Sequence, residues 1–242
     1  EGIVMTETEA LIIAFRRDDA LRRTLQALSE QSMMPKTITV WDNDNSRATE
    51  QVVATEGKRF PDETLKYVAS VDNVGPAGAL SSHLATVCAL KGPEAWVIRV
   101  DDDADLTDSE ELRNLLDLAV VATDANPLTA AVGLRGATFD HKRATLSAAT
   151  TLHANGLIEV DTLHGGYVPM FKVGPSVDVG GFNADFFFGF EELDFGLRLR
   201  RSGYKQYAAP GYLDRNPISF VRSSPKFPAE TPGWRQYYSM RN

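Results

Sequence analysis

The fold of this chain is decided by residues 96–105, whose sequence is WVIRVDDDAD. Residues 96–100 are mostly apolar and partly β-branched, which is typical of a buried strand. Four of the next five residues are aspartates, and none is Lys or Arg. Carboxylates held this close together repel one another, and burial beside a strand end increases the repulsion. A divalent cation bound by oxygen ligands would remove that repulsion, so the pattern predicts a metal site where the strand ends.

A simpler interpretation of the same aspartates is a solvated acidic turn. Such a turn would cap a helix that begins near residues 107–110, TDSE. Short motifs match by chance, and a lone acidic turn would favour this interpretation. The apolar strand before the turn, and the residues further along the chain, favour the metal site over the solvated turn.

Composition restricts the class of protein. The 242 residues are 43% hydrophobic and 24% charged, which is typical of a globular chain with a large core. The net charge of −8 argues against a nucleic-acid partner, whereas a nucleotide held through a metal is compatible with it. Cys88 is the only cysteine, so we expect no internal disulfide and a reducing, cytoplasmic location. We find no apolar run long enough to span a bilayer and expect no signal peptide.

The first half of the chain alternates between strand and helix patterns. Strands are predicted over residues 10–15, 37–41, 65–69 and 96–100, and helices around Leu21, over 48–58, over 79–90 and around Leu115. This alternation with short connections is the signature of parallel βαβ units. On the third helix we expect His83 to lie on the surface.

Polar residues follow each of these four strands. They are Arg16, Asp42, Asn73 and Asp101. In parallel sheets, ligands bind beyond the carboxyl ends of the strands. Four polar loops at one edge of one sheet therefore predict a nucleotide-type site in the first half of the chain.

After Asn126 the helical periodicity weakens. Strand-like stretches are predicted over residues 129–135, 138–152, 157–162, 168–173 and 204–208, with glycine turns between them and a helix over 195–202. Beyond Pro210 the prolines and arginines indicate an irregular tail.

A second acidic cluster, Glu191, Glu192 and Asp194, falls at a predicted helix start. A favourable N-terminal turn is one explanation, because helix dipoles stabilise anions there. The alternative is a general base that accepts a proton. Aromatic residues among 186–190 would exclude water and raise the pKa of such a carboxylate, while the dipole would lower it, and these opposing effects allow a pKa near the operating pH.

Several motifs together resemble one family. They are residues 37–43 (TITVWDN), 73–78 (NVGPAG), 101–103 (DDD), 165–167 (GGY), 180–183 (GGFN) and 190–198 (FEELDFGLR). In order and spacing they resemble the nucleotide-sugar glycosyltransferases of family 2, from about Ala10 to the end of the chain. The C-terminal residues Trp234, Tyr237, Tyr238, Arg241 and Asn242 are similar to a motif of the rhamnosyl- and galactofuranosyl-type branch.

The resemblance implies an α/β fold of the GT-A type. We expect a Rossmann-like, mostly parallel central sheet flanked by helices, with a smaller β region on the acceptor side. Residues 5–126 would form the donor-binding half, residues 127–209 the acceptor-side half of the same domain, and residues 210–242 an irregular tail.

The resemblance also implies roles for individual residues. The catalytic base would be Glu192, with Glu191 or Asp194 as alternatives. The metal, Mn²⁺ or Mg²⁺, would be held by Asp101, Asp103 and Asn216. Donor contacts would come from Ala14, Phe15, Arg16, Asp42, Asn73, Gly75, Asp101 and Asp102, and acceptor contacts from His164, Gly165 and Gly166.

Three departures from the family pattern stand out. The chain has Glu191-Glu192 where the family usually has Glu-Asp, so the expected base is one methylene longer. Asn216 stands where galactofuranosyl enzymes often have a metal-binding histidine, and its oxygen suits Mg²⁺ or Mn²⁺. The chain ends at Asn242, where relatives continue with more helix, so we expect the tail to be truncated.

The resemblance implies inverting, metal-dependent sugar transfer from a UDP- or dTDP-type donor to a glycan or lipid-linked glycan acceptor, in cell-surface polysaccharide synthesis. The site would lie in the cytoplasm at the inner face of the membrane, with peripheral membrane association.

Three other functions are open from the residues. One is a non-catalytic nucleotide-sugar-binding domain. The second is a sugar-nucleotide nucleotidyltransferase, but residues 14–18, AFRRD, lack the glycine expected of its phosphate loop. The third is a retaining glycosidase with Glu192 and Asp103 as its carboxylate pair, which would need a separation of ~5–5.5 Å.

Overall fold

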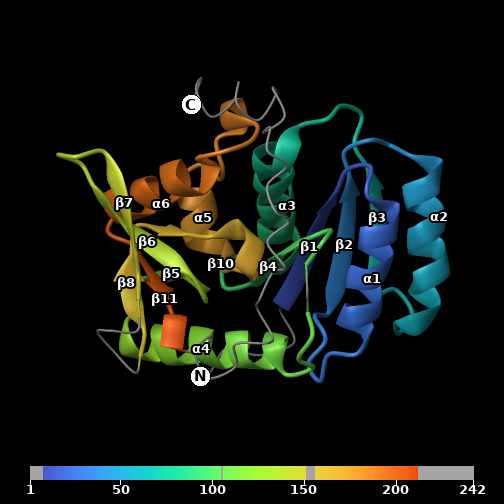
Figure 1. The fold of residues 1–242 in the computed structure, drawn as a ribbon, viewed down its shortest axis with the longest axis horizontal. Coiled ribbons are helices and arrows are strands. Elements are labelled where there is room, and N and C mark those ends of the chain that lie inside the picture. The colour runs from blue at the N-terminus through green and yellow to red at the C-terminus, as the bar shows by residue number, and fades with distance from the viewer. Residues whose placement is uncertain (1–7, 105, 151–155, 212–242) are drawn as a thin grey trace, which may run out of the picture.

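The computed structural model describes residues 8–104, 106–150 and 156–211, and a central sheet runs through all three ranges (Figure 1). Its eight strands, in spatial order, are β3 (Leu65–Ala69), β2 (Thr37–Asp42), β1 (Thr8–Ala14), β4 (Trp96–Asp101), β10 (Met170–Lys172), β5 (Thr129–Gly133), β11 (Lys205–Ala208) and β8 (Ile158–Val160). A second sheet contains β7 (Thr145–Ala148), β6 (Gly136–Asp140) and β9 (Thr162–Leu163).

Strand direction divides the large sheet. β1 to β4 pair in parallel, so their carboxyl ends lie at one edge. β10 runs antiparallel to both β4 and β5. The chain before β10 therefore approaches the same edge at which β4 ends. This mixed but mostly parallel sheet, with a smaller β region beside it, confirms the expected fold class.

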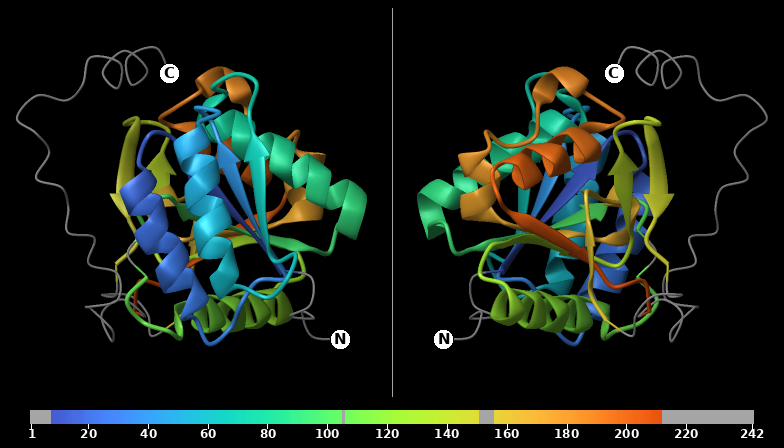
Figure 2. Two further views of the ribbon diagram at one scale, coloured as in Figure 1. Left: turned by 90° about the vertical axis from the view of Figure 1, so that its right-hand side faces the viewer. Right: turned by 90° about the vertical axis from the view of Figure 1, so that its left-hand side faces the viewer.

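Helices cover both faces of the large sheet (Figure 2). One face packs against α1 (Asp18–Ser29), α2 (Arg47–Glu56) and α4 (Glu111–Ala125), and the other against α3 (Gly75–Lys91), α5 (Val173–Asp178) and α6 (Glu191–Arg201). Short 3₁₀ turns are η2 (Gly57–Arg59), η4 (Gly165–Tyr167) and η5 (Ala184–Phe186). Within the described ranges, no helix is both long and apolar enough to cross a bilayer.

The alternation of side chains along β4 explains why both faces are covered. Trp96, Ile98 and Val100 are buried in the core beneath α1, α2 and α4. Val97 is buried in the core on the α3 and α6 side. Successive side chains of a strand point to opposite faces, so Arg99 and Asp101 also face the α6 side.

Most predicted elements are confirmed, with shifted bounds. α3 begins at Gly75, four residues before its predicted start, because Pro76 suits the first turn of a helix. α6 likewise begins at Glu191, earlier than predicted. The strand predicted over 168–173 is confirmed only for β10, and α5 follows it directly. Gly174 permits this helix, since a Cβ there would lie 2.9 Å from Pro93 Cβ.

The surface position predicted for His83 is wrong. α3 contacts β1, α5 and η5, so most of its circumference is covered. His83 is only 6% exposed, and its buried Nε2 has no hydrogen-bond partner among the described residues. Burial lowers the pKa of His83 to about 4, so the imidazole is neutral in the folded protein.

We expect His83 to make the fold less stable in mild acid. The unfolded chain takes up a proton near pH 6.5, whereas the folded chain does so only near pH 4. The free energy of unfolding contributed by this group is therefore lost as the pH falls from 6.5 to 4, by at most roughly 3 kcal/mol. Urea unfolding at pH 7 and pH 4.5 should show a smaller pH dependence for His83→Gln than for the wild type.

The exposed His141 provides the matched control. His141→Gln should keep the pH dependence of the wild type. An unchanged pH dependence in His83→Gln would show that this imidazole is not buried in the neutral form.

Candidate active site

The three aspartates after β4 have different surroundings. Asp102 is fully buried and accepts a hydrogen bond from the backbone N–H of Phe15 at 3.3 Å. The side chains of Asp101 and Asp103 are 20% and 32% exposed. Asp102 therefore ties the turn to the end of β1, while the two flanking carboxylates reach the surface.

Arg17 neutralises part of this acidic turn. Its guanidinium pairs with Asp102 and lies 2.6 Å from Asp103 Oδ2. Burial raises the pKa of Asp102 to about 7, Asp103 and Asp101 add to the shift, and Arg17 opposes it. A metal is therefore not the only relief for the repulsion between the aspartates. Arg17 was missed as a site residue, although two adjacent arginines at a strand end are visible in the sequence.

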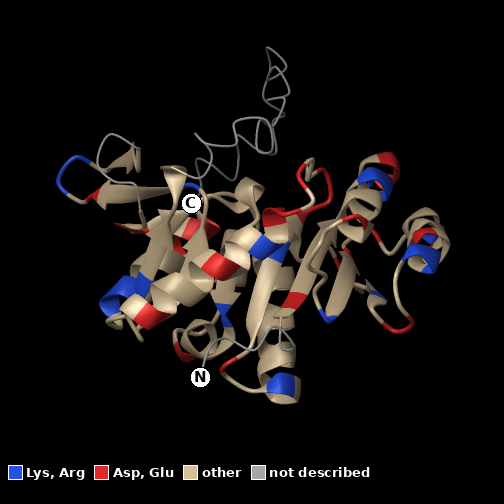
Figure 3. Ribbon diagram, turned by 90° about the horizontal axis from the view of Figure 1, so that it is seen from below, with Lys and Arg blue, Asp and Glu red and all other residues tan. Residues whose placement is uncertain are grey.

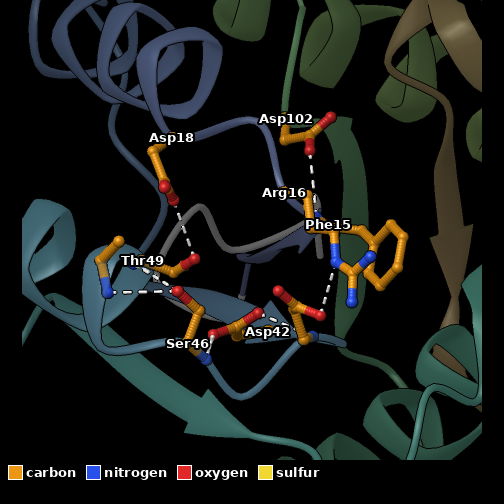
Figure 4. Close-up of polar contacts among 9 residues, drawn as sticks. Phe15, Arg16, Asp18, Asp42, Ser46, Thr49 and Asp102 are labelled. Atoms are coloured by element: carbon orange, nitrogen blue, oxygen red, sulfur yellow. Dashed lines mark hydrogen bonds and ion pairs between the residues drawn. The ribbon is translucent and has the colours of Figure 1, made fainter.

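The segment after β1 is held in an unusual backbone conformation. Arg16 has a φ of 56°, in the left-handed region, and its Nε lies 2.8 Å from Asp44 Oδ1 (Figure 4). Ala14 is buried at the end of β1, and Phe15 is exposed. Such backbone conformations cost energy and are common at functional sites. An open depression of about 510 Å³ beside this segment is lined by Arg16, Arg17, Asp18, Asp19, Ala20 and Arg23.

Asp42 shapes the loop after β2. Its buried carboxylate accepts hydrogen bonds from the backbone N–H groups of Asp44 at 2.9 Å and of Ser46 at 2.7 Å (Figure 4). It also accepts one from the Tyr67 hydroxyl at 2.8 Å. Burial and the bond to Asp42 raise the pKa of Tyr67. Both oxygens of Asp42 thus already have protein partners, and its donor contact stays a prediction.

The loop after β3 meets a loop from the second half of the chain. Asn73 Oδ1 accepts from the backbone N–H of Gly75 at 3.0 Å. Gly75 has a φ of +65°, and a Cβ there would lie 2.4 Å from the carbonyl oxygen of Phe187. Phe187 and Phe190 also have positive φ, so the segment before α6 is strained where it packs on this glycine.

The three acidic residues at the start of α6 also differ from one another. Glu191 is buried, and burial together with Glu192 raises its pKa to about 7. Asp194 is held by Arg198 at 2.7 Å and 2.9 Å. The Glu192 side chain is 22% exposed. Asp194 is similarly accessible at 26%, so exposure excludes only the buried Glu191 as a group that touches a substrate.

Arg99 connects the two acidic clusters. From β4, its Nη1 donates to Glu192 Oε1 at 2.7 Å and lies 4.0 Å from Glu191, while its Nε lies 3.3 Å from Asp101 Oδ1. Burial alone would lower the pKa of Arg99, but the three carboxylates together raise it, so the guanidinium stays charged. Arg99 was missed in the sequence, where its only signal is a charge within an apolar strand.

The predicted acceptor motif lies against this pair. A Cβ on Gly165 would fall 2.5 Å from both Arg99 Nη1 and Glu192 Oε1, so only glycine leaves room for them. His164 Nδ1 accepts from the backbone N–H of Gly166 at 3.3 Å. The motif reaches this place because η4 precedes the antiparallel β10 and contacts β4.

Metal ligands were predicted at Asp101, Asp103 and Asn216. Asn216 and the C-terminal aromatic motif lie outside the described residues. Within residues 8–211, apart from the two gaps, no three His, Cys, Asp or Glu side chains form a ready metal-binding group. In the view of Figure 3, segments with Lys or Arg are interspersed with segments with Asp or Glu.

Solved structures share this fold. The mannosyltransferase PcManGT from Pyrobaculum calidifontis, in complex with GDP-Man and Mn²⁺, is 21% identical and matches 84% of this chain with a TM-score of 0.61. GalNAc-T7 with UDP, GalNAc and Mn²⁺ is 11% identical over 85% of this chain, with a TM-score of 0.63. The chain covers 55% and 43% of these two structures, so it spans about half their length.

Two relatives are similar in sequence. Galactofuranosyltransferase GlfT1 from Mycobacterium tuberculosis is 27% identical over 98% of this chain and 81% of the relative. GlfT1 from Mycolicibacterium smegmatis is 31% identical over 48% of this chain and 37% of its own length. The family model described as "Glycosyltransferase like family 2" matches residues 7–231, and the chain therefore belongs to glycosyltransferase family 2.

Proposed function

We propose that this chain transfers a sugar from a nucleoside-diphosphate sugar to an acceptor hydroxyl, with inversion. The observation that carries the proposal is the shared Arg99 guanidinium, which brings Asp101 and Glu192 to one place. Transfer needs a carboxylate near the donor diphosphate and another near the acceptor hydroxyl. In this proposal Asp101 is the first of these carboxylates and Glu192 the second, and their shared contact with Arg99 supports the pairing.

Glu192 is the base in this proposal. Its carboxylate takes the proton of the acceptor hydroxyl while that oxygen forms a bond to the anomeric carbon. The bond from this carbon to the diphosphate breaks on the opposite face, and the electron pair leaves with the diphosphate. Glu191 is too buried to touch an acceptor. Asp194 pairs with Arg198 of its own helix, whereas Glu192 pairs with Arg99 of β4, the strand that also carries Asp101.

Asp101 and Asp103 fit a role in holding Mn²⁺ or Mg²⁺. They offer partly exposed oxygen ligands on one turn, while buried Asp102 anchors that turn. Mg²⁺ is commonly bound through one or two carboxylates plus substrate phosphates, so a larger protein cage is not required. When bound, the ion would act as a Lewis acid that stabilises the charge of the leaving diphosphate. The Mn²⁺ in PcManGT and GalNAc-T7 supports this role.

The names of the relatives suggest the substrates. GlfT1, which matches nearly the whole chain, is a galactofuranosyltransferase. We therefore propose galactofuranose as the transferred sugar, a UDP- or dTDP-type donor, and a glycan or lipid-linked glycan acceptor of the cell surface. The proposal includes a cytoplasmic site at the inner face of the membrane, with peripheral association.

Glu192→Gln should remove the base while preserving the size of the side chain. Turnover should fall by ~10²–10⁴-fold, because that is the typical contribution of a positioned base. Donor affinity should stay nearly the same, since this change affects the chemical step. Initial rates with a nucleoside-diphosphate galactofuranose, and isothermal titration with the nucleotide, would measure both.

The control is Glu159→Gln, which replaces an exposed carboxylate paired with Lys205 on β8 and β11. It should keep wild-type turnover. Full activity in Glu192→Gln would refute the assignment of Glu192 as the base. If Asp194→Asn then lost most of the activity, Asp194 would be the base instead. A wild type that binds nucleotide tightly but never turns over would be a binding domain instead.

Asp103→Ala should abolish the metal-dependent part of nucleotide binding. In the wild type, Mn²⁺ plus a nucleoside diphosphate should raise the melting temperature more than either alone, because a ligand of the folded state stabilises it. In Asp103→Ala that extra rise should disappear. Asp140→Ala, at the end of β6 with a 40% exposed side chain, is the control and should behave as the wild type. An equal rise in all three proteins would argue against a metal at Asp103.

A further inference from the structure

We propose that Arg99 is a positioning residue that fixes the orientation of Glu192 for proton transfer. This inference rests on the proposed function and adds a component that acts through the base. Arg99 is 7% exposed and the Glu192 side chain is 22% exposed. Arg99 can therefore act on the carboxylate without touching the sugar. The inference concerns the one strong contact that the Glu192 side chain makes to a cation in the described structure.

The surroundings of Arg99 differ from those of a stabilising ion pair. Three carboxylates, Asp101, Glu191 and Glu192, face one guanidinium. A buried ion pair contributes little to the free energy of unfolding compared with apolar residues of similar size. The additional carboxylates repel one another, which lowers that contribution further. A buried group of charges that adds little stability, placed at the carboxylate proposed as the base, favours a functional role.

The contact leaves one carboxylate oxygen for chemistry. Arg99 donates to Oε1 of Glu192, and the partly exposed side chain can present Oε2 to the acceptor. A glutamate has one more rotatable bond than the aspartate usual in this family, so it needs a stronger restraint. The hydrogen bond from Arg99 supplies that restraint. The backbone of Gly165 packs against both side chains and limits their movement.

The geometry also provides a way to disturb the contact without removing a charge. In Gly165→Ala the new Cβ would lie 2.5 Å from the ends of both side chains. These ends are flexible, so the protein should fold while the pair is displaced. Gly57→Ala is the matched control, because its Cβ would meet nothing closer than 3.9 Å. For the charge itself, Arg99→Gln is matched by Arg200→Gln, which removes a guanidinium from another buried carboxylate, that of Asp161.

The experiment measures kcat and KM for single and double variants that retain the wild-type circular dichroism spectrum. Arg99→Gln and Gly165→Ala should each lower kcat by at least about tenfold, because small displacements of reacting groups have large effects on rate. Arg99→Lys should be intermediate, since it retains the charge but not the fork of donors. Gly57→Ala and Arg200→Gln should stay within twofold of the wild type.

The decisive comparison is with Glu192→Gln. If Arg99 acts through Glu192, adding Arg99→Gln or Gly165→Ala to Glu192→Gln should cause no further loss of kcat. A multiplicative loss in the double variants would overturn the inference, as would wild-type kcat in Gly165→Ala. If Arg99→Gln fails to fold, the Gly165→Ala series gives the same test.

The two proposals fail in different ways. A wild type that transfers no sugar from any nucleoside-diphosphate donor overturns the proposed function and this inference together. An active wild type, inactive as Glu192→Gln but indifferent to Arg99→Gln and Gly165→Ala, overturns the inference alone.

Discussion

A guanidinium buried inside a protein must be surrounded by anions, and the site of this chain is built on that requirement. Arg99 occupies an inward-facing position of β4, where an apolar side chain would be the ordinary choice. Its charge is stable there only because Asp101, Glu191 and Glu192 lie around it. One buried cation therefore holds the end of β4 and the first turn of α6 together.

The direction of β10 makes this meeting possible. With a parallel β10, the segment before it would lie at the opposite edge of the sheet. Because β10 runs antiparallel to β4, η4 reaches the edge where the aspartate turn begins. Gly165 then allows the backbone to touch the Arg99–Glu192 pair. The topology brings residues from the second half of the chain to the edge where β4 ends, and the absence of a side chain at Gly165 lets the backbone approach closely.

Local sequence patterns predicted the strands, most helices and the acidic turn. They did not predict which side chains pair between elements that are distant in sequence. Strand alternation and aspartate spacing are properties of neighbouring residues, so β4 and the acidic turn could be predicted from the sequence. The pairing of Arg99 with Glu192 joins residues 93 positions apart, and depends on a sheet order that short-range patterns do not encode. For the same reason the pairing of Arg17 with Asp102 and Asp103 was missed. A bound metal was therefore the only counter-charge expected for these aspartates. His83 was misplaced because the covering of α3 by α5 could not be anticipated while α5 itself was missed.

The contact between Gly75 and Phe187 has a consequence for engineering this protein. The loop after β3 packs against the backbone of the segment before α6, and the two surfaces fit without room for a methyl group at Gly75. A chimera that takes only the segment before α6 from a relative would pack that new segment against the original loop at Gly75. The two would then be expected to clash. A chimera should therefore exchange the loop after β3 and the segment before α6 as a matched pair.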